Sequence, residues 1–201
     1  IHGLNSDMNG LKALNIEKYA KKNDLAFVRF DCRGHGKSFG KFEDFTISDW
    51  KQDILTVIDN LSKGPQILIG SSMGGWLMIL AARARAKRII GLIGLAAATD
   101  FGNLLYKNLN KKNKNEITSY SSFGFSYYLK KKFFTDAKKN NILHKPFRFN
   151  NPLILIHGMK DDVVNVNMPK RIMKITTGHN VQIIYLKSSD HRLSKKNDLN
   201  T

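Results

Sequence analysis

The residue best suited to chemistry is Ser72, which lies in the run Gly-Ser-Ser-Met-Gly at residues 70–74. This run matches G-x-S-x-G, and it joins an apolar run at 66–69 to an Ala- and Leu-rich segment at 73–86. A serine on the sharp turn between a strand and a helix has its hydroxyl exposed beside the positive end of the helix. Small residues on either side let the chain turn without clashes. We therefore expect Ser72 to be a nucleophile rather than a packing residue.

A second glycine-containing segment, at 33–38, ends in Gly-Lys-Ser, as a phosphate-binding P-loop does. A P-loop also needs a glycine five residues before Gly36, and this chain has Asp31 there. The run Phe-Gly-Lys at 39–41 is moreover a poor start for a helix. We therefore reject a P-loop.

A serine nucleophile needs a histidine base and a carboxylate, and in chains with this strand–turn–helix they follow the serine as acid and then histidine. The six histidines are His2, His35, His144, His157, His179 and His191. Only the last two follow the strand expected to carry the acid. His191 comes after the apolar run 181–186, where the carboxyl ends of parallel strands assemble sites, whereas His179 precedes it. We expect His191 to be the base, His179 to be a solvated turn residue and His2 to be structural.

The acid is expected just after the apolar run 153–156, in the loop at 157–164. This loop has two adjacent carboxylates, Asp161 and Asp162, and the spacing alone does not separate them. The backbone N–H groups of Leu4 and Met73 are expected to form an oxyanion hole, because Met73 follows the nucleophile directly.

Apolar runs alternate along the chain with segments of helical period. The predicted strands are 25–30, 66–69, 89–96, 153–156 and 181–186, and the predicted helices are 46–61, 73–86 and 170–175. Thr46, with Asp49 three residues later, has the pattern of a capping box. This alternation predicts an α/β fold with a mainly parallel sheet and helices on both faces.

Segment 99–150 departs from this alternation. It contains eleven aromatic residues and eleven Lys or Arg residues against three acidic ones. A long insertion in a compact domain is more often functional than idle. The alternative is a poorly packed surface excursion.

The composition limits the function classes. The chain has 201 residues, a formal net charge of +17 and one cysteine, Cys32, which excludes an internal disulfide framework and an all-cysteine metal site. The charge raises nucleic acid or anionic membranes as partners, but no nucleic-acid module is present and the lysines are scattered. No apolar run reaches the roughly 20 residues of a membrane helix. The chain opens with isoleucine inside a motif, so we expect a fragment whose targeting information is missing.

Taken together, the motifs resemble the α/β-hydrolase family. Within it they resemble the branch of mitochondrial palmitoyl-protein thioesterases and acyl-glucuronide esterases, together with their bacterial relatives. The motifs that carry this resemblance are HGLNSDM at 2–8, FDCRGHGKS at 30–38, FEDFTISDW at 42–50, GSSMGGW at 70–76, HGMKDDVV at 157–164 and DHRLS at 190–194. The resemblance is weak in segment 99–150.

The resemblance implies Ser72 as the nucleophile, Asp161 as the acid and His191 as the base. It implies a core of residues 1–98 and 151–201 with a cap at 99–150 over the acyl site. We expect the cap to bind the acyl chain through Phe123, Phe125, Tyr127 and Tyr128. It further implies a fragment truncated at both ends, with a sheet edge left unpaired.

The implied activity is hydrolysis of carboxylic esters or thioesters through an acyl-serine intermediate, including S-acyl (palmitoyl) proteins. No metal or organic cofactor is needed. The expected partners are a small-molecule or S-acylated protein substrate, with no specific nucleic acid and no transmembrane segment; no oligomeric state is assigned. The expected location is cytoplasmic in a bacterium and mitochondrial in a eukaryote. Two alternatives stay open: a serine peptidase of the same fold, and a non-catalytic basic binding protein.

Overall fold

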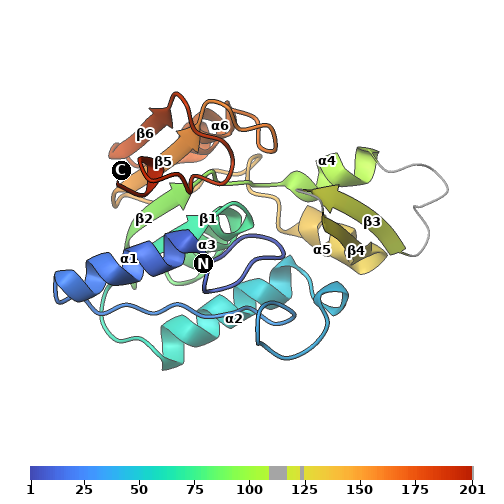
Figure 1. Ribbon diagram of the computed structural model, residues 1–201, viewed down its shortest axis with the longest axis horizontal. Coiled ribbons are helices and arrows are strands. Elements are labelled where there is room, and N and C mark those ends of the chain that lie inside the picture. Colours follow the sequence, from blue (N-terminus) through green and yellow to red (C-terminus); the bar gives the residue numbers. More distant parts are fainter. Residues whose placement is uncertain (109–116, 123–124, 201) are drawn as a thin grey trace.

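In the part of the chain that the structure describes, the central sheet has four parallel strands. The computed structural model describes residues 1–108, 117–122 and 125–200. The strands lie in the order β1-β2-β5-β6, and Figure 1 shows them side by side. Their bounds are β1 (Gln66–Ser71), β2 (Ile89–Leu95), β5 (Leu153–Gly158) and β6 (Val181–Leu186). This confirms the predicted α/β class with a mainly parallel sheet.

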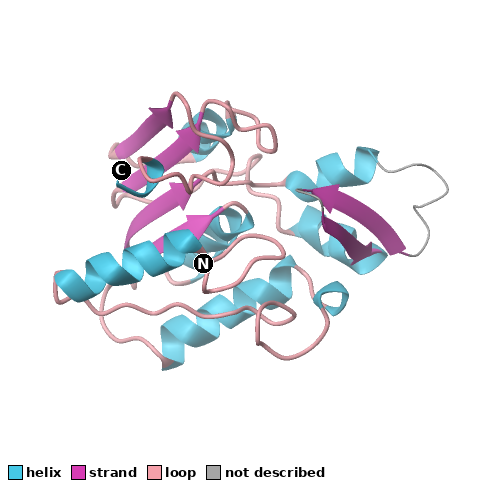
Figure 2. Ribbon diagram, viewed as in Figure 1, coloured by secondary structure: helices cyan, strands magenta, loops and turns pink. Residues whose placement is uncertain are grey.

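Helices cover this sheet (Figure 2). Their bounds are α1 (Leu11–Lys22), α2 (Ile47–Asn60), α3 (Met73–Ala84) and α6 (Met168–Ile175), and single 3₁₀ turns lie at η1 (Phe42–Asp44) and η3 (Asp198–Asn200). Helix α3 packs against β1 and β2, α2 packs on α3, and α6 packs against β5 and β6. The predicted capping box at the start of α2 is present, since Thr46 and Asp49 each accept a hydrogen bond from the backbone N–H of the other.

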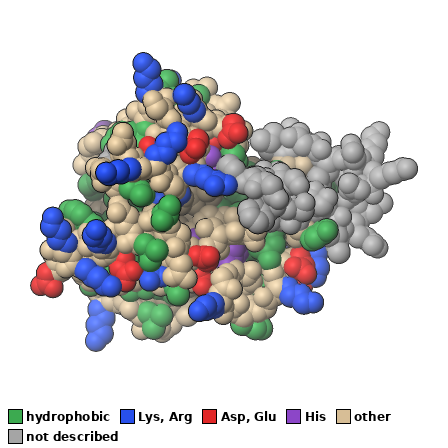
Figure 3. Space-filling model, viewed as in Figure 1, with side chains coloured by type: hydrophobic (Ala, Val, Ile, Leu, Met, Phe, Trp, Pro, Cys, Tyr) green, Lys and Arg blue, Asp and Glu red, His purple; other side chains and the backbone are tan. Residues whose placement is uncertain are grey.

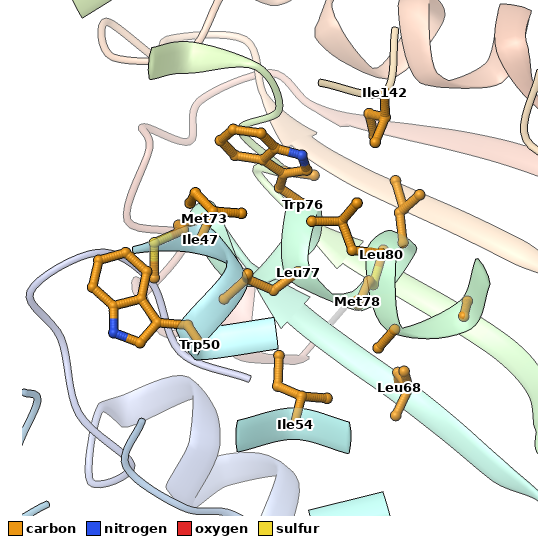
Figure 4. Packing of buried hydrophobic residues seen from close by; sticks show 14 of the residues in the cluster. Ile47, Trp50, Ile54, Leu68, Met73, Trp76, Leu77, Met78, Leu80 and Ile142 are labelled. Carbon is orange, nitrogen blue, oxygen red and sulfur yellow. The ribbon is translucent and has the colours of Figure 1, made fainter. Parts of the chain in front are cut away.

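The hydrophobic core is centred on α3, the helix that begins directly after Ser72. Residues 73–82 of this helix are all buried, which explains why the segment is apolar on every side. Trp50 and Ile54 of α2 pack into the same cluster with Met73, Trp76 and Leu77 (Figure 4). The start of α3 is therefore held by large buried side chains, and the turn before it is held in place with it.

The predicted strand at 25–30 is wrong. No described strand pairs with this segment, and a strand exists only through hydrogen bonds to a neighbour. Its residues Leu25 and Val28 are exposed. On the free side of β1, Ile1 hydrogen-bonds to the backbone of Ile69 and Ser71 at 2.7 and 3.0 Å.

Segment 99–150 lies between β2 and β5 in the chain, and its described helices and strands stand beside the sheet at the right of Figure 1. It contains α4 (Phe101–Asn108), the antiparallel pair β3 (Ile117–Ser122) and β4 (Phe125–Lys130), and α5 (Lys131–Lys139). Phe133 and Ala137 of α5 are buried in the main core. Helix α5 is therefore packed, which rules out the surface-excursion alternative for this part of the segment.

Two carboxylates hold segment 99–150 in place, one within the segment and one between the segment and the core. Asp100 accepts hydrogen bonds from the backbone N–H groups of Ile142 and Leu143 at 2.9 and 3.0 Å, so the first and last parts of the segment are held together. Asp136 of α5 accepts from the backbone N–H and the hydroxyl of Ser48, in the first turn of α2, at 2.8 and 2.6 Å. A helix N-terminus has unpaired N–H groups and a positive dipole end, so a carboxylate from another helix is stabilised there.

The positive charge does not gather into one patch on the face shown in Figure 3, where Lys and Arg side chains are scattered among other types. Within the described part of the chain, no helix has the length and apolar character needed to cross a bilayer.

Candidate active site

The turn between β1 and α3 holds Ser72 in a strained backbone conformation, with φ 54° and ψ −120°. Such positive φ is unfavourable for a residue with a side chain, so the surroundings must impose it. A Cβ at Gly70 would lie 2.3 Å from the carbonyl oxygen of Gly74, and a Cβ at Gly74 would lie 2.4 Å from that of Ile1. Glycine is therefore required at both positions for the strand, the turn and the helix to pack this closely.

Ser72, His191 and Asp161 come together although they lie on three different loops. The Oγ of Ser72 is 3.0 Å from Nε2 of His191, and Nδ1 of the same ring is 2.8 Å from Oδ2 of Asp161. The ring can thus accept the serine proton on one nitrogen while its other N–H donates to the carboxylate. This is the geometry of a nucleophile, a base and an orienting acid.

The structure separates the two aspartates that the spacing left open. The Asp161 side chain is fully buried, and its Oδ1 accepts hydrogen bonds from the N–H groups of Val163 and Val164 at 2.9 and 2.8 Å. Burial acts to raise the pKa of Asp161, but the hydrogen bonds from His191 and from the backbone outweigh it, so the pKa lies below its usual value. Asp162 is exposed.

The loop that carries His191 rests directly on β5. A Cβ at Gly158 would lie 2.3 Å from the carbonyl oxygen of Ser189, so only glycine lets the loop approach the strand this closely. Lys160 N–H also donates to that oxygen at 2.9 Å. Leu193, two residues after His191, is buried and has φ 46°. The loops of the acid and the base therefore position each other.

The expected oxyanion-hole residues lie beside Ser72. Met73 is the first residue of α3, so its N–H has no acceptor within the helix. A Cβ at Gly3, the residue before Leu4, would lie only 3.2 Å from Cβ of Ser72. The two backbone segments that were expected to supply the donors thus flank the serine.

His2, which was expected to be structural, contacts the backbone through both ring nitrogens. Its Nε2 accepts a hydrogen bond from the Cys32 N–H at 3.0 Å, and its Nδ1 lies 2.9 Å from the carbonyl oxygen of Gly3. Burial, with a smaller contribution from neighbouring His35, lowers the pKa of His2 to about 4. Burial likewise raises the pKa of the Cys32 thiol to about 12, so this cysteine stays protonated.

The four expected acyl-binding residues are placed only in part. Phe123 lies outside the described residues, and Phe125 and Tyr127 are described only by their backbone in β4. The Tyr128 side chain is exposed. Their role in binding an acyl chain stays a prediction.

Sequence reasoning passed over one residue at this site, His157. Its Nε2 lies 3.2 Å from Oδ2 of Asp161, the oxygen that also faces His191. The HG-x-x-D pattern at 157–161 already places a histidine four residues before the acid. Among the described residues, no group of three or more His, Cys, Asp or Glu side chains could hold a metal ion.

Comparison with known proteins places this geometry in a family. A model of the hydrolase family described as "Serine aminopeptidase, S33" matches residues 1–140. The bovine protein named palmitoyl-protein thioesterase ABHD10, mitochondrial, is 38% identical over 208 residues, covering 99% of this chain and 68% of the bovine one. The chain belongs to the α/β-hydrolase family. The human protein of the same name is 39% identical over the same shares of the two chains.

Solved structures of α/β-hydrolases agree with this assignment. The mouse protein titled alpha/beta hydrolase domain-containing protein 10 superposes with a TM-score of 0.91 at 35% identity, covering 100% of this chain and 83% of that one. A putative hydrolase from Agrobacterium vitis gives a TM-score of 0.93 at 28% identity, covering 99% and 82%. The sheet and the helices described above are therefore those of an α/β-hydrolase core.

Proposed function

We propose that this α/β-hydrolase is a serine hydrolase that cleaves carboxylic ester or thioester bonds through an acyl-serine intermediate. The observation that carries the proposal is the continuous contact from Ser72 Oγ through His191 to Asp161, at 3.0 and 2.8 Å. The relatives named palmitoyl-protein thioesterase support the ester and thioester chemistry. Asp161, being buried and held by backbone N–H groups, orients the imidazole and stabilises it when it is cationic.

The reaction proceeds in two halves. His191 takes the proton of Ser72 as Oγ attacks the carbonyl carbon, and it then gives this proton to the leaving alcohol or thiol as the bond to the acyl group breaks. Water next repeats the attack on the acyl-serine, with His191 again as the base, and the free acid leaves while Ser72 regains its proton. The N–H groups of Leu4 and Met73 stabilise the negative oxygen in both tetrahedral intermediates.

A fluorophosphonate probe tests the proposed nucleophile. Only an activated serine reacts with it, so we expect the wild type to be labelled and Ser72→Ala to be neither labelled nor active. Ser71→Ala is the matched control, because it changes the neighbouring serine in the same turn. Labelling of Ser72→Ala as strongly as Ser71→Ala would contradict Ser72 as the nucleophile. Absence of labelling in the wild type would contradict the proposal and favour the alternative of a non-catalytic basic binding protein.

The name of the matching family model keeps a peptidase as the second candidate. The two are separated by a palmitoyl thioester, a matching oxygen ester and an aminoacyl amide, each tested with wild type and Ser72→Ala. We expect turnover of the ester and thioester but not of the amide. Cleavage of the amide at a comparable kcat/KM would identify a peptidase instead.

We further propose that segment 99–150 is a cap that binds the acyl chain. In support, Phe101 of α4 packs edge-on against Trp76, which lies four residues after the nucleophile, with ring centroids 5.4 Å apart. An aromatic side chain from this segment thus reaches the helix that begins directly after Ser72. We also propose the locations expected from the resemblance, cytoplasmic in a bacterium and mitochondrial in a eukaryote, which fractionation of the native cell would test.

The cap proposal predicts a dependence on acyl length. Each methylene that is buried adds about 0.8 kcal/mol, nearly fourfold in affinity, until the pocket is full. We expect kcat/KM to rise along a series of acyl esters, and Phe123→Ala, Phe125→Ala or Tyr127→Ala to flatten the rise more than Tyr128→Ala, whose side chain is already exposed. A flat series that no variant changes would show that the acyl chain binds elsewhere.

A further inference from the structure

His157 is a polar residue in a place that packing alone would give to an apolar one. It lies in β5, and its side chain has no exposed surface. Its Nδ1 is buried and has no hydrogen-bond partner within the described part of the chain. A buried nitrogen without a hydrogen-bond partner lowers the stability of the fold, whereas a leucine at this position would leave no polar atom unpaired. The reason for a histidine here must therefore lie with the other nitrogen.

That other nitrogen faces two oxygens. Nε2 of His157 lies 3.1 Å from the carbonyl oxygen of Val164 and 3.2 Å from Oδ2 of Asp161. Both oxygens are acceptors, so Nε2 carries the proton and Nδ1 does not. Burial lowers the pKa of His157, which keeps the ring neutral. The neutral ring thus points the Nε2–H dipole of His157 at the Asp161 carboxylate.

The contacts of His157 close a ring around Asp161. Val164 donates its N–H to Oδ1 of Asp161 at 2.8 Å, while its carbonyl oxygen accepts from His157. The opposite oxygen, Oδ2, faces both His157 and His191. His157 therefore fixes the turn that carries the acid, and it limits where Oδ2 can move relative to the base.

We propose that His157 is a positioning residue for the reaction: its Nε2–H, shared between Val164 and Asp161, holds Oδ2 in line with Nδ1 of His191. This inference rests on the proposed function, because it acts through the acid and the base. The contacts of its Nε2 are with Val164 and Asp161, so it acts on the reaction only through the acid. Its neutral state also leaves His191 as the one ring at Asp161 that takes up a proton during turnover.

Two substitutions test the positioning role of His157, because glutamine and asparagine carry the same amide group on side chains of different length. In His157→Gln the amide nitrogen reaches the place of Nε2, whereas in His157→Asn it reaches the place of Nδ1. We expect His157→Gln to keep kcat within about threefold. We expect His157→Asn to lower kcat by about tenfold to a hundredfold with little change in KM, as outer supporting residues of sites typically do. The low-field NMR signal of the His191 Nδ1 proton should persist in His157→Gln and shift or vanish in His157→Asn.

A folded His157→Asn variant with wild-type kcat and an unchanged His191 signal would overturn the inference. Should both variants fail to fold, nitrogen-15 chemical shifts of the wild-type histidines decide instead. A proton on Nε2 of His157 and none on Nδ1 supports the inference, and the reverse tautomer refutes it. Absence of fluorophosphonate labelling in the wild type would refute the proposed function, whereas the tautomer measurement tests His157 independently of activity.

Discussion

Asp161 receives more support than its partnership with one histidine requires. Two backbone N–H groups bind its Oδ1, and two imidazole rings face its Oδ2. A carboxylate buried this completely stays charged only because these donors replace the water that it has lost. Asp162, the next residue, is exposed and lacks such an environment. Asp161 and Asp162 therefore have the same side chain, but only Asp161 has surroundings suited to an orienting acid.

This contrast predicts unequal losses in Asp161→Asn and Asp162→Asn. Asparagine at 161 leaves the imidazole without its carboxylate and favours the wrong tautomer, which can lower kcat on the order of 10⁴-fold. The same change at 162 should leave kcat within a few-fold of wild type. Steady-state kinetics with one ester substrate, on proteins matched by their unfolding midpoints, measures both. Equal losses, or a larger loss at 162, would move the acid to Asp162.

At this scale the sequence predicts more of the site than of its surroundings. Ser72 and His191 follow from a motif and from chain order, because a strand, a turn and a helix leave few positions for them. The choice of Asp161 came from resemblance, since two adjacent carboxylates have the same spacing to any strand. His157 was passed over, because the predicted strand ended at residue 156 and the loop at 157–164 was considered only as the source of the acid.

Helix α5 is docked on α2 and α3 by several directional hydrogen bonds, of which those to Asp136 are charged. Asp136 accepts two hydrogen bonds from Ser48 in the first turn of α2, and Asn140, four residues later in the chain, donates to the Ser48 hydroxyl at 2.9 Å. Trp76 adds a bond from its indole N–H to the Asn140 carbonyl oxygen at 3.0 Å. Helix α5 is thus held by a few directional hydrogen bonds in addition to its buried aromatic residues.

We therefore expect Asp136→Ala to loosen α5. Leaving the first-turn N–H of α2 without its charged acceptor should cost about 2 kcal/mol of unfolding free energy. Amide hydrogen exchange should accelerate in 131–139 before it does in β1 or β5. Asp44→Ala is the matched control, because Asp44 forms an exposed pair with Lys130 of the same segment and exposed pairs contribute little. Equal effects of the two variants would show that Asp136 does not dock the helix.

Elements that have a strong internal pattern could be predicted, and elements that depend on neighbours could not. Helix α2 has its capping box and α3 its apolar composition, and both begin where the sequence indicates. Helix α1 has no side-chain cap at Gly10 and exposes Leu11 and Leu14, so its pattern is weak. Segment 25–30 has the apolar composition of a strand but no described strand beside it.

At the scale of the whole molecule, His2, His35 and His157 are buried, and burial favours their neutral form. Burial lowers the pKa of His2 to about 4, and it also lowers the pKa values of His35 and His157. An unfolded chain binds protons at these positions near the ordinary pKa of 6.5, whereas the folded chain binds them only at a lower pH. Proton binding therefore stabilises the unfolded state relative to the folded one. The free energy of unfolding that these histidines contribute above pH 6.5 is lost as the pH falls toward 4.

This predicts a fall in unfolding free energy between pH 6.5 and 4, of which His2 contributes roughly 3 kcal/mol, from a pKa of 6.5 lowered to about 4. Urea unfolding at several pH values in this range measures the slope. His2→Gln keeps an acceptor for the Cys32 N–H and cannot be protonated, so its slope should be smaller. An identical slope in both proteins would show that His2 does not carry the effect.

The hydrogen bonds that Asp100 accepts from the N–H groups of Ile142 and Leu143 bring the start of a long insertion close to its last part. A segment that leaves and returns at one point can be exchanged as a cassette, because a replacement has no distance to span across the core. If the segment binds the acyl chain as proposed, an exchange at this junction would change the substrate range while Ser72, His191 and Asp161 stay in place. The exchange has one condition: an incoming cassette must supply an acceptor and an apolar cover for Trp76.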